Sequence, residues 1–170
     1  QLLMVHDLAY LHFPKFIAWH QSWYYKLFTP GFIKKAKQVL TVSDFSKADL
    51  VKHFQSATNK ISTVYPAARA GFQPLSWEEK SQVKDSFSDG REYFLFVGGI
   101  HPRKNLLILL KAFSLFKKLQ KSNMKLLVAG RMAWQYEDLL EKIKTYKYRE
   151  DLVLLGALEE AQLTRITASA

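Results

Sequence analysis

Short apolar runs alternate with longer amphipathic stretches along this chain of 170 residues. The apolar runs, typical of strands buried on both faces of a parallel sheet, are residues 2–5, 39–42, 61–65, 93–97, 125–129 and 152–155. The helical stretches are residues 20–37, 44–54, 77–87, 106–120, 136–146 and 159–168. Strands that alternate with helices need crossover connections, so the pattern predicts an α/β fold with parallel sheets flanked by helices.

One stretch interrupts this rhythm. Residues 66–76 contain Pro66, Gly71 and Pro74 and show no usable periodicity, which is typical of a linker between modules. Three predicted strands precede it and three follow it. Each side is therefore expected to form part of a doubly wound sheet.

The composition excludes several classes of protein. The chain has no cysteine, so disulfides, thiolate zinc sites and cysteine nucleophiles are ruled out. The longest apolar run, residues 106–110, is much shorter than the roughly 18 to 20 residues of a membrane span.

The chain begins in an apolar run and ends in a predicted helix, and we expect it to be an internal piece of a longer protein.

Positive charge is concentrated in the first part of the chain. The net charge is +10, of which residues 1–75 contribute +6 and residues 76–170 contribute +4. Such a balance favours anionic partners, namely nucleic acid, phosphorylated substrates or an anionic membrane surface. A lysine-rich solvated surface explains the same charge.

A glycine pair followed by two cations marks the most informative turn. Gly98 and Gly99 end a predicted strand, and Arg103 and Lys104 come just before a predicted helix for which Asn105 is a candidate N-cap. Glycines allow close backbone approach, and a helix N-terminus attracts anions. The pattern fits a phosphate site with Lys104 in the first helical turn, and it fits an ordinary strand-to-helix turn equally well. It is neither a P-loop nor a dinucleotide fingerprint.

Several polar residues follow the first two predicted strands. His6 and Asp7 are expected at the carboxyl edge of the sheet, where a histidine can exchange protons with a substrate or serve a structural role. Ser43 is expected to cap a helix, since no glycine flanks it as in a nucleophile elbow. His12 and His20 match no zinc signature, so no metal site is expected.

Aromatic residues and lysines are interleaved over residues 10–38. This composition suits docking at a membrane surface or stacking on single-stranded nucleic acid. A partly buried helix with a basic outer face is the simpler interpretation, and we expect it.

Six segments together resemble glycosyltransferase family 4, also called glycosyl transferases group 1. They are residues 6–8 (HDL), 36–46 (AKQVLTVSDFS), 60–66 (KISTVYP), 97–106 (VGGIHPRKNL), 126–130 (LLVAG) and 154–156 (LLG), the last followed by Leu163. The resemblance covers nearly the whole chain. It implies a GT-B fold, in which two Rossmann-like domains face each other across a cleft. It also implies transfer of a sugar from a nucleotide donor with retention of anomeric configuration.

The resemblance assigns roles to individual residues. Arg103 and Lys104 correspond to the pair that grips the donor diphosphate, with Gly98 and Gly99 as the turn beneath it. Many members carry arginine where this chain has Gly99, which leaves the charge on Arg103 and Lys104. His6 corresponds to the catalytic residue on the acceptor side. The base and ribose pocket corresponds to Gly130, Arg131, Gly156 and Ala157. No metal or cofactor is expected beyond the UDP- or GDP-linked sugar donor.

The resemblance also divides the chain and suggests its partners. Residues 1–70 would be the C-terminal part of the acceptor-side domain, 71–76 the linker, and 77–170 the N-terminal part of the nucleotide-sugar-binding domain. The family's paired glutamates would lie beyond residue 170, so the chain alone is expected to be inactive. Expected partners are a nucleotide sugar and a glycan or lipid-linked acceptor, without nucleic acid. The expected location is the cytoplasm, either free or peripheral to the inner face of the membrane.

Two alternatives to a transferase stay open at this point. One is a non-catalytic basic Rossmann-like module that binds nucleotides or nucleic acid, and a steep salt dependence of oligonucleotide binding would favour it. The other is a peripheral membrane scaffold that uses residues 19–37, and anionic liposomes would detect it.

Overall fold

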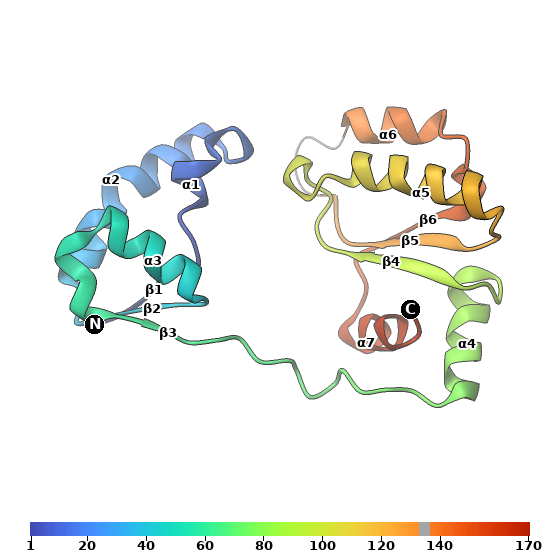
Figure 1. Cartoon of the computed structure of the whole chain (residues 1–170), viewed down its shortest axis with the longest axis horizontal. Coiled ribbons are helices and arrows are strands. Elements are labelled where there is room, and N and C mark those ends of the chain that lie inside the picture. The colour runs from blue at the N-terminus through green and yellow to red at the C-terminus, as the bar shows by residue number, and fades with distance from the viewer. Residues whose placement is uncertain (133–136) are drawn as a thin grey trace. The chain divides into compact units, whose positions relative to one another are not determined.

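The computed structural model describes residues 1–132 and 137–170, which form two compact units, Gln1–Ala68 and Arg69–Ala170 (Figure 1). Each unit contains a three-stranded sheet in which all strands run parallel. The strand order is β1-β2-β3 in the first unit and β4-β5-β6 in the second. Consecutive strands are thus neighbours joined by crossover connections, which confirms the predicted α/β class.

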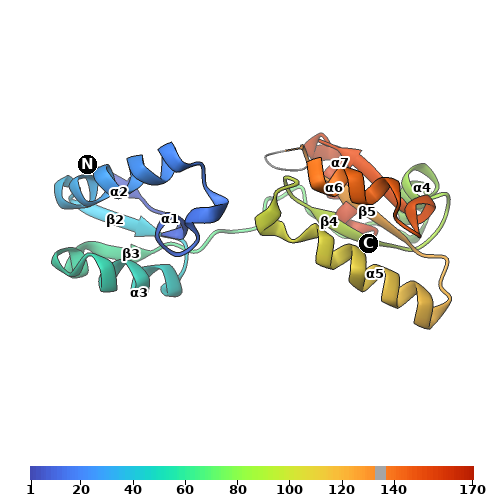
Figure 2. The same cartoon turned by 90° about the horizontal axis from the view of Figure 1, so that it is seen from above.

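Helices cover one face of the sheet in the first unit. The elements in chain order are β1 (Leu2–Met4), α1 (Ala9–His12), η1 (Pro14–Phe16), α2 (Trp19–Lys35), β2 (Gln38–Thr41), α3 (Asp44–His53), η2 (Gln55–Lys60) and β3 (Ile61–Thr63). All three α-helices lie on the same side of the sheet in Figure 1, and Figure 2 shows α2 and α3 running alongside the strands. The buried apolar residues cluster on that side: Leu8, Tyr10, Ile33, Ala36, Val39, Leu50, Ala57 and Ile61.

Helices cover both faces of the sheet in the second unit. Its elements are α4 (Trp77–Ser88), β4 (Tyr93–Val97), η3 (Pro102–Lys104), α5 (Leu106–Gln120), β5 (Lys125–Ala129), α6 (Glu137–Lys144), η4 (Arg149–Asp151), β6 (Leu152–Gly156) and α7 (Glu160–Ala168). Figure 1 shows α5 and α6 on one face and α4 and α7 on the other. Leu126 and Val128 of the central strand join the core under α5 and α6, whereas Leu127 joins the core against α4 and α7.

The six strands and six long helices confirm the elements predicted from periodicity, with ends displaced by one or two residues. The expected helix start at residue 136 lies outside the described residues. The one-turn helix α1 was not predicted, because four residues are too few to show a helical period.

The prediction that every strand is buried on both faces is wrong. Among the strands of the described residues, only β5 is buried along its whole length. The side chains of Leu2 and Met4 in β1 are exposed, because no helix of the first unit covers that face of the sheet. Apolar sequence alone does not distinguish a strand covered on two faces from a strand covered on one.

Candidate functional site

Three loops lie together at the carboxyl edge of the β4-β5-β6 sheet. Pairing continues beyond the ends of β4 and β5, since Gly98 N–H donates to Ala129 O at 2.9 Å and Ile100 N–H donates to Arg131 O at 2.9 Å. On the other side, Gly130 N–H donates to Gly156 O at 2.7 Å. The backbone of the predicted diphosphate turn therefore lies beside the loops predicted to hold the base and ribose.

Gly130 approaches the backbone of Gly98 too closely to carry a side chain. A Cβ atom on Gly130 would lie 1.9 Å from the carbonyl oxygen of Gly98 and 2.6 Å from its carbonyl carbon. The two residues also have φ angles of +151° and +157°, which residues with a side chain rarely adopt. Close packing of the two loops thus requires glycine at residue 130, whereas at residue 98 only the φ angle favours it. Gly99 follows as a half-buried residue of the same turn.

Arg103 and Lys104 lie in the 3-10 helix η3, which connects β4 to α5. The Lys104 side chain turns back over the glycine turn, with its Cε 3.8 Å from the position that a Cβ on Gly98 would occupy. Both cations are exposed, and within the described part of the chain neither contacts a carboxylate. The expectation that Lys104 lies in the first turn of α5 is wrong, because Pro102 begins a separate turn before that helix.

His101 and Asn105 fix the two ends of this short helix. The Nδ1 atom of His101 accepts a hydrogen bond from the Arg103 N–H at 3.1 Å. Burial, and secondarily the charge of Arg103, lower the pKa of His101, which favours the neutral ring that this bond requires. Asn105 is the N-cap residue of α5, but it has a φ of +53° and its side chain does not cap the helix. Asn105 therefore holds the predicted N-cap position without forming a side-chain capping bond.

The other predicted donor-site residues lie at the same edge. Arg131 directly follows Gly130 and is exposed, and no ion pair to it is formed by the described residues. Ala157 is exposed directly after Gly156, which ends β6 with a φ of +68°. In the second unit, the backbone of several glycines and the side chains of three cations thus lie at one edge of the sheet. The cations are Arg103, Lys104 and Arg131.

His6 lies at the carboxyl end of β1 in the first unit. It lines a pocket of about 320 Å³ together with Asp7, Tyr10, Tyr25 and other residues of β1 and α2. The Asp7 carboxylate accepts a hydrogen bond from Ala9 N–H at 2.9 Å, which ties it to the start of α1. His6 is therefore an exposed ring at the wall of a largely apolar pocket, where it can donate to or accept from a bound hydroxyl group.

Ser43 caps helix α3, as predicted. Its hydroxyl oxygen accepts a hydrogen bond from the Ser46 N–H at 3.1 Å. The next residue, Asp44, accepts hydrogen bonds from Tyr65 at 2.5 Å and from Thr63 at 2.7 Å. These bonds lower the pKa of the Asp44 carboxyl, because they stabilise its charged form. This polar cluster is structural, since it joins the start of α3 to the end of β3.

The outer surface of α2 carries exposed aromatic side chains in addition to the expected lysines. The residues that it buries are Ser22, Thr29 and Ile33, two of them polar. Aromatic side chains point outward instead, with Trp19 and Trp23 80% and 62% exposed. The predicted partly buried helix with a basic outer face is confirmed, since Lys26, Lys34 and Lys35 are exposed, and the outer face is aromatic as well as basic.

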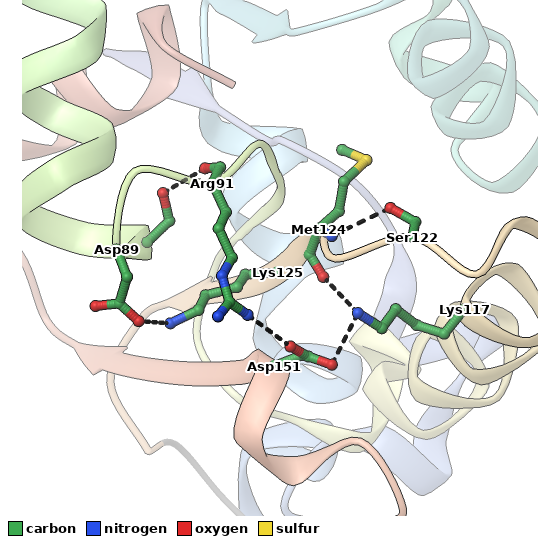
Figure 3. Close-up of polar contacts among 8 residues, drawn as sticks. Asp89, Arg91, Lys117, Ser122, Met124, Lys125 and Asp151 are labelled. Carbon is green, nitrogen blue, oxygen red and sulfur yellow. Dashed lines mark hydrogen bonds and ion pairs between the residues drawn. The ribbon is translucent and has the colours of Figure 1, made fainter.

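Two polar clusters were missed at the sequence level. At the amino edge of the second sheet, Lys117 and Arg91 contact Asp151, and Lys125 contacts Asp89 (Figure 3). In the first unit, three residues form the other cluster, His12, Asp49 and His53. Only the spacing of Asp49 and His53, four residues apart on one helix, was visible as a signal in the sequence.

Comparison with known proteins agrees with this geometry. The family described as glycosyl transferases group 1 matches residues 76–170. The O-antigen chain mannosyltransferase B of Escherichia coli is 26% identical over 167 residues, which cover 97% of this chain and 44% of that protein. The chain thus spans less than half the length of this curated relative.

Solved structures share the fold at low sequence identity. Anabaena Alr3699/HepE in complex with UDP and glucose matches with a TM-score of 0.74 at 14% identity, covering 99% of this chain and 44% of that one. WaaG, a glycosyltransferase involved in lipopolysaccharide biosynthesis, matches with a TM-score of 0.79 at 14% identity, covering 99% and 48%. These matches confirm the predicted fold of GT-B type. With more than half of its residues matched by the family, the chain belongs to the glycosyl transferases group 1.

Proposed function

We propose that this chain belongs to a retaining glycosyltransferase that moves a hexose from a nucleoside diphosphate donor to an acceptor in cell-envelope glycan biosynthesis. One observation carries the proposal. This chain belongs to the family, and its Lys104 side chain lies over the turn of Gly98. The backbone of Gly98 packs against Gly130 at the carboxyl edge of a parallel sheet. Open α/β sheets bind their ligands at this edge.

In the proposed mechanism, the protein stabilises the leaving diphosphate with fixed charges. Cleavage of the glycosidic phosphate bond leaves the bonding electrons on a diphosphate oxygen, where negative charge develops. Arg103 and Lys104 supply positive charge at that place, and backbone N–H groups at the start of α5 add hydrogen-bond donors. Because these groups are already in position, this step requires no divalent metal or further cofactor.

The donor pocket and the acceptor role are assigned in the same proposal. Gly130, Arg131, Gly156 and Ala157 would line the base and ribose pocket, since their loops adjoin the diphosphate turn. His6 would contact the reacting sugar or acceptor, because it is exposed at the wall of a pocket. HepE is described in complex with UDP and the curated relative is a mannosyltransferase, which supports a UDP- or GDP-hexose as the donor.

Nucleotide titration tests the donor site. Calorimetry of the intact protein with UDP and with GDP should show binding of one of them, weakened at least tenfold by Lys104→Ala through loss of a charge-assisted contact. Lys111→Ala is the matched control, since Lys111 is an exposed lysine of the adjacent helix α5. Equal binding by both variants would remove Lys104 from the site. Oligonucleotide binding with a steep salt dependence, without nucleotide binding, would favour the non-catalytic module instead.

We further propose that α2 contacts an anionic membrane surface, as suits an enzyme whose acceptor is lipid-linked. Trp19 and Trp23 are exposed on α2, and Lys26, Lys34 and Lys35 are exposed on the same helix. Amphipathic aromatic rings together with lysines favour the interface of anionic bilayers. None of the described helices is long and apolar enough to cross a membrane.

Sedimentation with liposomes tests this contact. The protein should sediment with vesicles that contain anionic lipid, and Trp19→Ser with Trp23→Ser should reduce the bound fraction severalfold. The control is Trp77→Ser, because Trp77 is a similarly exposed tryptophan, 76% exposed, in the second unit. Unchanged sedimentation of the double variant would exclude α2 as the contact.

A further inference from the structure

Two histidines and an aspartate meet in the first unit, outside the proposed donor site. His12 ends the short helix α1, and Asp49 and His53 lie one turn apart on α3. Each residue offers one donor atom, and these atoms lie within 4.8 Å of one another. We propose that this cluster is a binding site for a divalent transition metal of the zinc type.

The distances between the donor atoms are close to those of a metal site. The Nε2 atom of His12 lies 2.8 Å from Asp49 Oδ2, and the Nδ1 atom of His53 lies 3.2 Å from Asp49 Oδ1. With Zn–N and Zn–O bonds of about 2.0–2.2 Å, ligand atoms at tetrahedral angles are roughly 3.3 to 3.5 Å apart. Small side-chain rotations would therefore admit an ion among the three residues.

Asp49 gives the cluster its negative charge. Its side chain is only 13% exposed, and its partners in the described part of the chain are the two imidazoles. Neither partner is a permanent cation such as lysine or arginine. A carboxylate removed from water is stabilised by a nearby positive charge, and a divalent ion would supply it.

The two rings differ from a finished metal site in one contact, but both are accessible to an ion. The Nδ1 atom of His53 lies 2.9 Å from the main-chain carbonyl of Asp49, which fixes the orientation of this ring on its own helix. Because this hydrogen bond needs a proton on Nδ1, an ion bound at this nitrogen would take the place of the proton and break the bond. The His12 and His53 side chains are 41% and 30% exposed, so that water can complete the coordination.

The chemistry of the three ligands selects the ion. Two imidazole nitrogens with one carboxylate suit zinc and its neighbours in the transition series, whereas magnesium and calcium prefer oxygen ligands alone. The expectation of no metal was drawn from His12 and His20, and from the absence of cysteine. It did not consider His12 with Asp49, because 37 residues separate them in sequence.

A bound ion would join α1 to α3. The helix α1 has four residues and no side-chain N-cap, so it contributes little stability on its own. It follows the segment that carries His6, and its anchoring would steady that segment. The role is therefore structural, and the sugar-transfer step proposed above does not depend on it.

Calorimetric titration of the intact protein with zinc chloride, with magnesium chloride for comparison, tests the site. We expect one zinc ion to be bound at the cluster, no comparable binding of magnesium, and at least tenfold weaker zinc binding in His12→Asn and in His53→Asn. His20→Asn is the matched control, because His20 is an exposed histidine outside the cluster. Failure of the wild-type protein to bind zinc, or equal binding by His12→Asn, would overturn the proposal.

Two further measurements protect the test against misfolded variants. Asp49→Asn keeps the size of the side chain and removes its charge, so it should weaken zinc binding while the circular dichroism spectrum stays unchanged. Zinc should also slow amide hydrogen exchange in residues 9–13 of the wild-type protein, and cobalt should give visible absorption bands that zinc abolishes. Exchange and absorption that do not respond to the metals would contradict the site.

Discussion

The two edges of the β4-β5-β6 sheet both carry cations, but the surroundings of these cations differ. At the amino edge, Arg91, Lys117 and Lys125 each contact a carboxylate of Asp151 or Asp89 (Figure 3). At the carboxyl edge, the cations are exposed and meet no carboxylate within the described residues; they are Arg103, Lys104 and Arg131.

This difference distinguishes cations that stabilise the fold from those proposed to bind a ligand. The Lys117 and Lys125 side chains are 6% and 8% exposed, so each needs an internal partner to offset the loss of water. Cations at the carboxyl edge keep their hydration and remain available to an anion. We therefore expect substitutions at the amino edge to alter stability, and charge substitutions at the carboxyl edge to alter nucleotide binding.

The largest expected effect is the loss of a glycine. Gly130→Ala would place a Cβ atom 1.9 Å from the backbone of Gly98 at a φ of +157°, so the two loops must separate. Overpacking and backbone strain together should lower the free energy of unfolding by about 4 kcal/mol. Urea denaturation followed by circular dichroism measures this.

Gly156→Ala is the matched control for that substitution. Gly156 lies at the same edge with a φ of +68°, but a Cβ atom there would meet nothing within 4 Å. Only backbone strain remains, which should cost about 1 to 2 kcal/mol. Equal losses in the two variants would contradict the role of close packing between Gly98 and Gly130.

The next effect tests the paired amino edge. Asp151→Ala removes the partner of Lys117, leaving a nearly buried ammonium with one hydrogen bond, to Met124 O at 3.1 Å. Loss of one member of a buried ion pair should lower the free energy of unfolding by about 3 kcal/mol. Nucleotide affinity of the folded protein should be unchanged.

Lys117→Met sharpens this result, because it removes the buried charge and keeps a long apolar side chain beside Phe113 and Tyr148. Replacement of a buried charge by an apolar group is often nearly neutral, so the loss should be within about 1 kcal/mol. A loss as large as that in Asp151→Ala would mean that the ion pair itself, rather than the unpaired charge, governs stability.

The third effect concerns the unpaired edge. If the proposed function is right, Lys104→Ala should lower the rate of sugar transfer by tenfold or more in the intact protein, since it removes a charge proposed to act on the leaving diphosphate. The midpoint of urea denaturation should stay the same, because Lys104 is exposed and its loss leaves no buried charge. Donor turnover within twofold of the wild type would contradict the proposed role.

The sequence predicted the carboxyl edge better than the amino edge. The turn at Gly98 and the loop at Gly130 follow strands that their own apolar residues reveal, and parallel strands must bring both to one edge. The contact of Arg91 with Asp151 joins residues that are 60 positions apart in the sequence, so no local pattern predicts it. In the first unit, the contact of His12 with Asp49 was hidden for the same reason.

Other differences arise from packing. The sequence predicted a basic outer face for α2 but not the exposure of so many of its aromatic side chains, since apolar side chains are usually buried. Ser22 and Thr29 occupy the inner face instead, with the Ser22 hydroxyl donating to Tyr10 O at 3.4 Å. Composition cannot determine which face of such a helix meets the sheet when both faces carry apolar and polar residues.

The smallest expected effect is a pH dependence at the amino edge. The hydrogen bond and charge of Lys125 lower the pKa of Asp89 from its ordinary value of 3.8. A depressed pKa in the folded state means that this pair stabilises the protein above pH 3.8 and that the contribution is lost as the pH falls through the depressed value. Asp89→Asn should therefore be less stable than the wild type at pH 7, and the difference should shrink below pH 4.

Asparagine is a suitable replacement because residue 89 ends α4 in the left-handed conformation, with a φ of +53°, which asparagine tolerates. Other carboxylates with depressed pKa values, such as Asp44 and Glu79, are common to both proteins and cancel in the difference. Thermal denaturation of the two proteins from pH 7 to pH 2.5 measures it. A difference that is independent of pH would mean that Asp89 acts on the helix end, and the amino edge would then owe its stability to Asp151 alone.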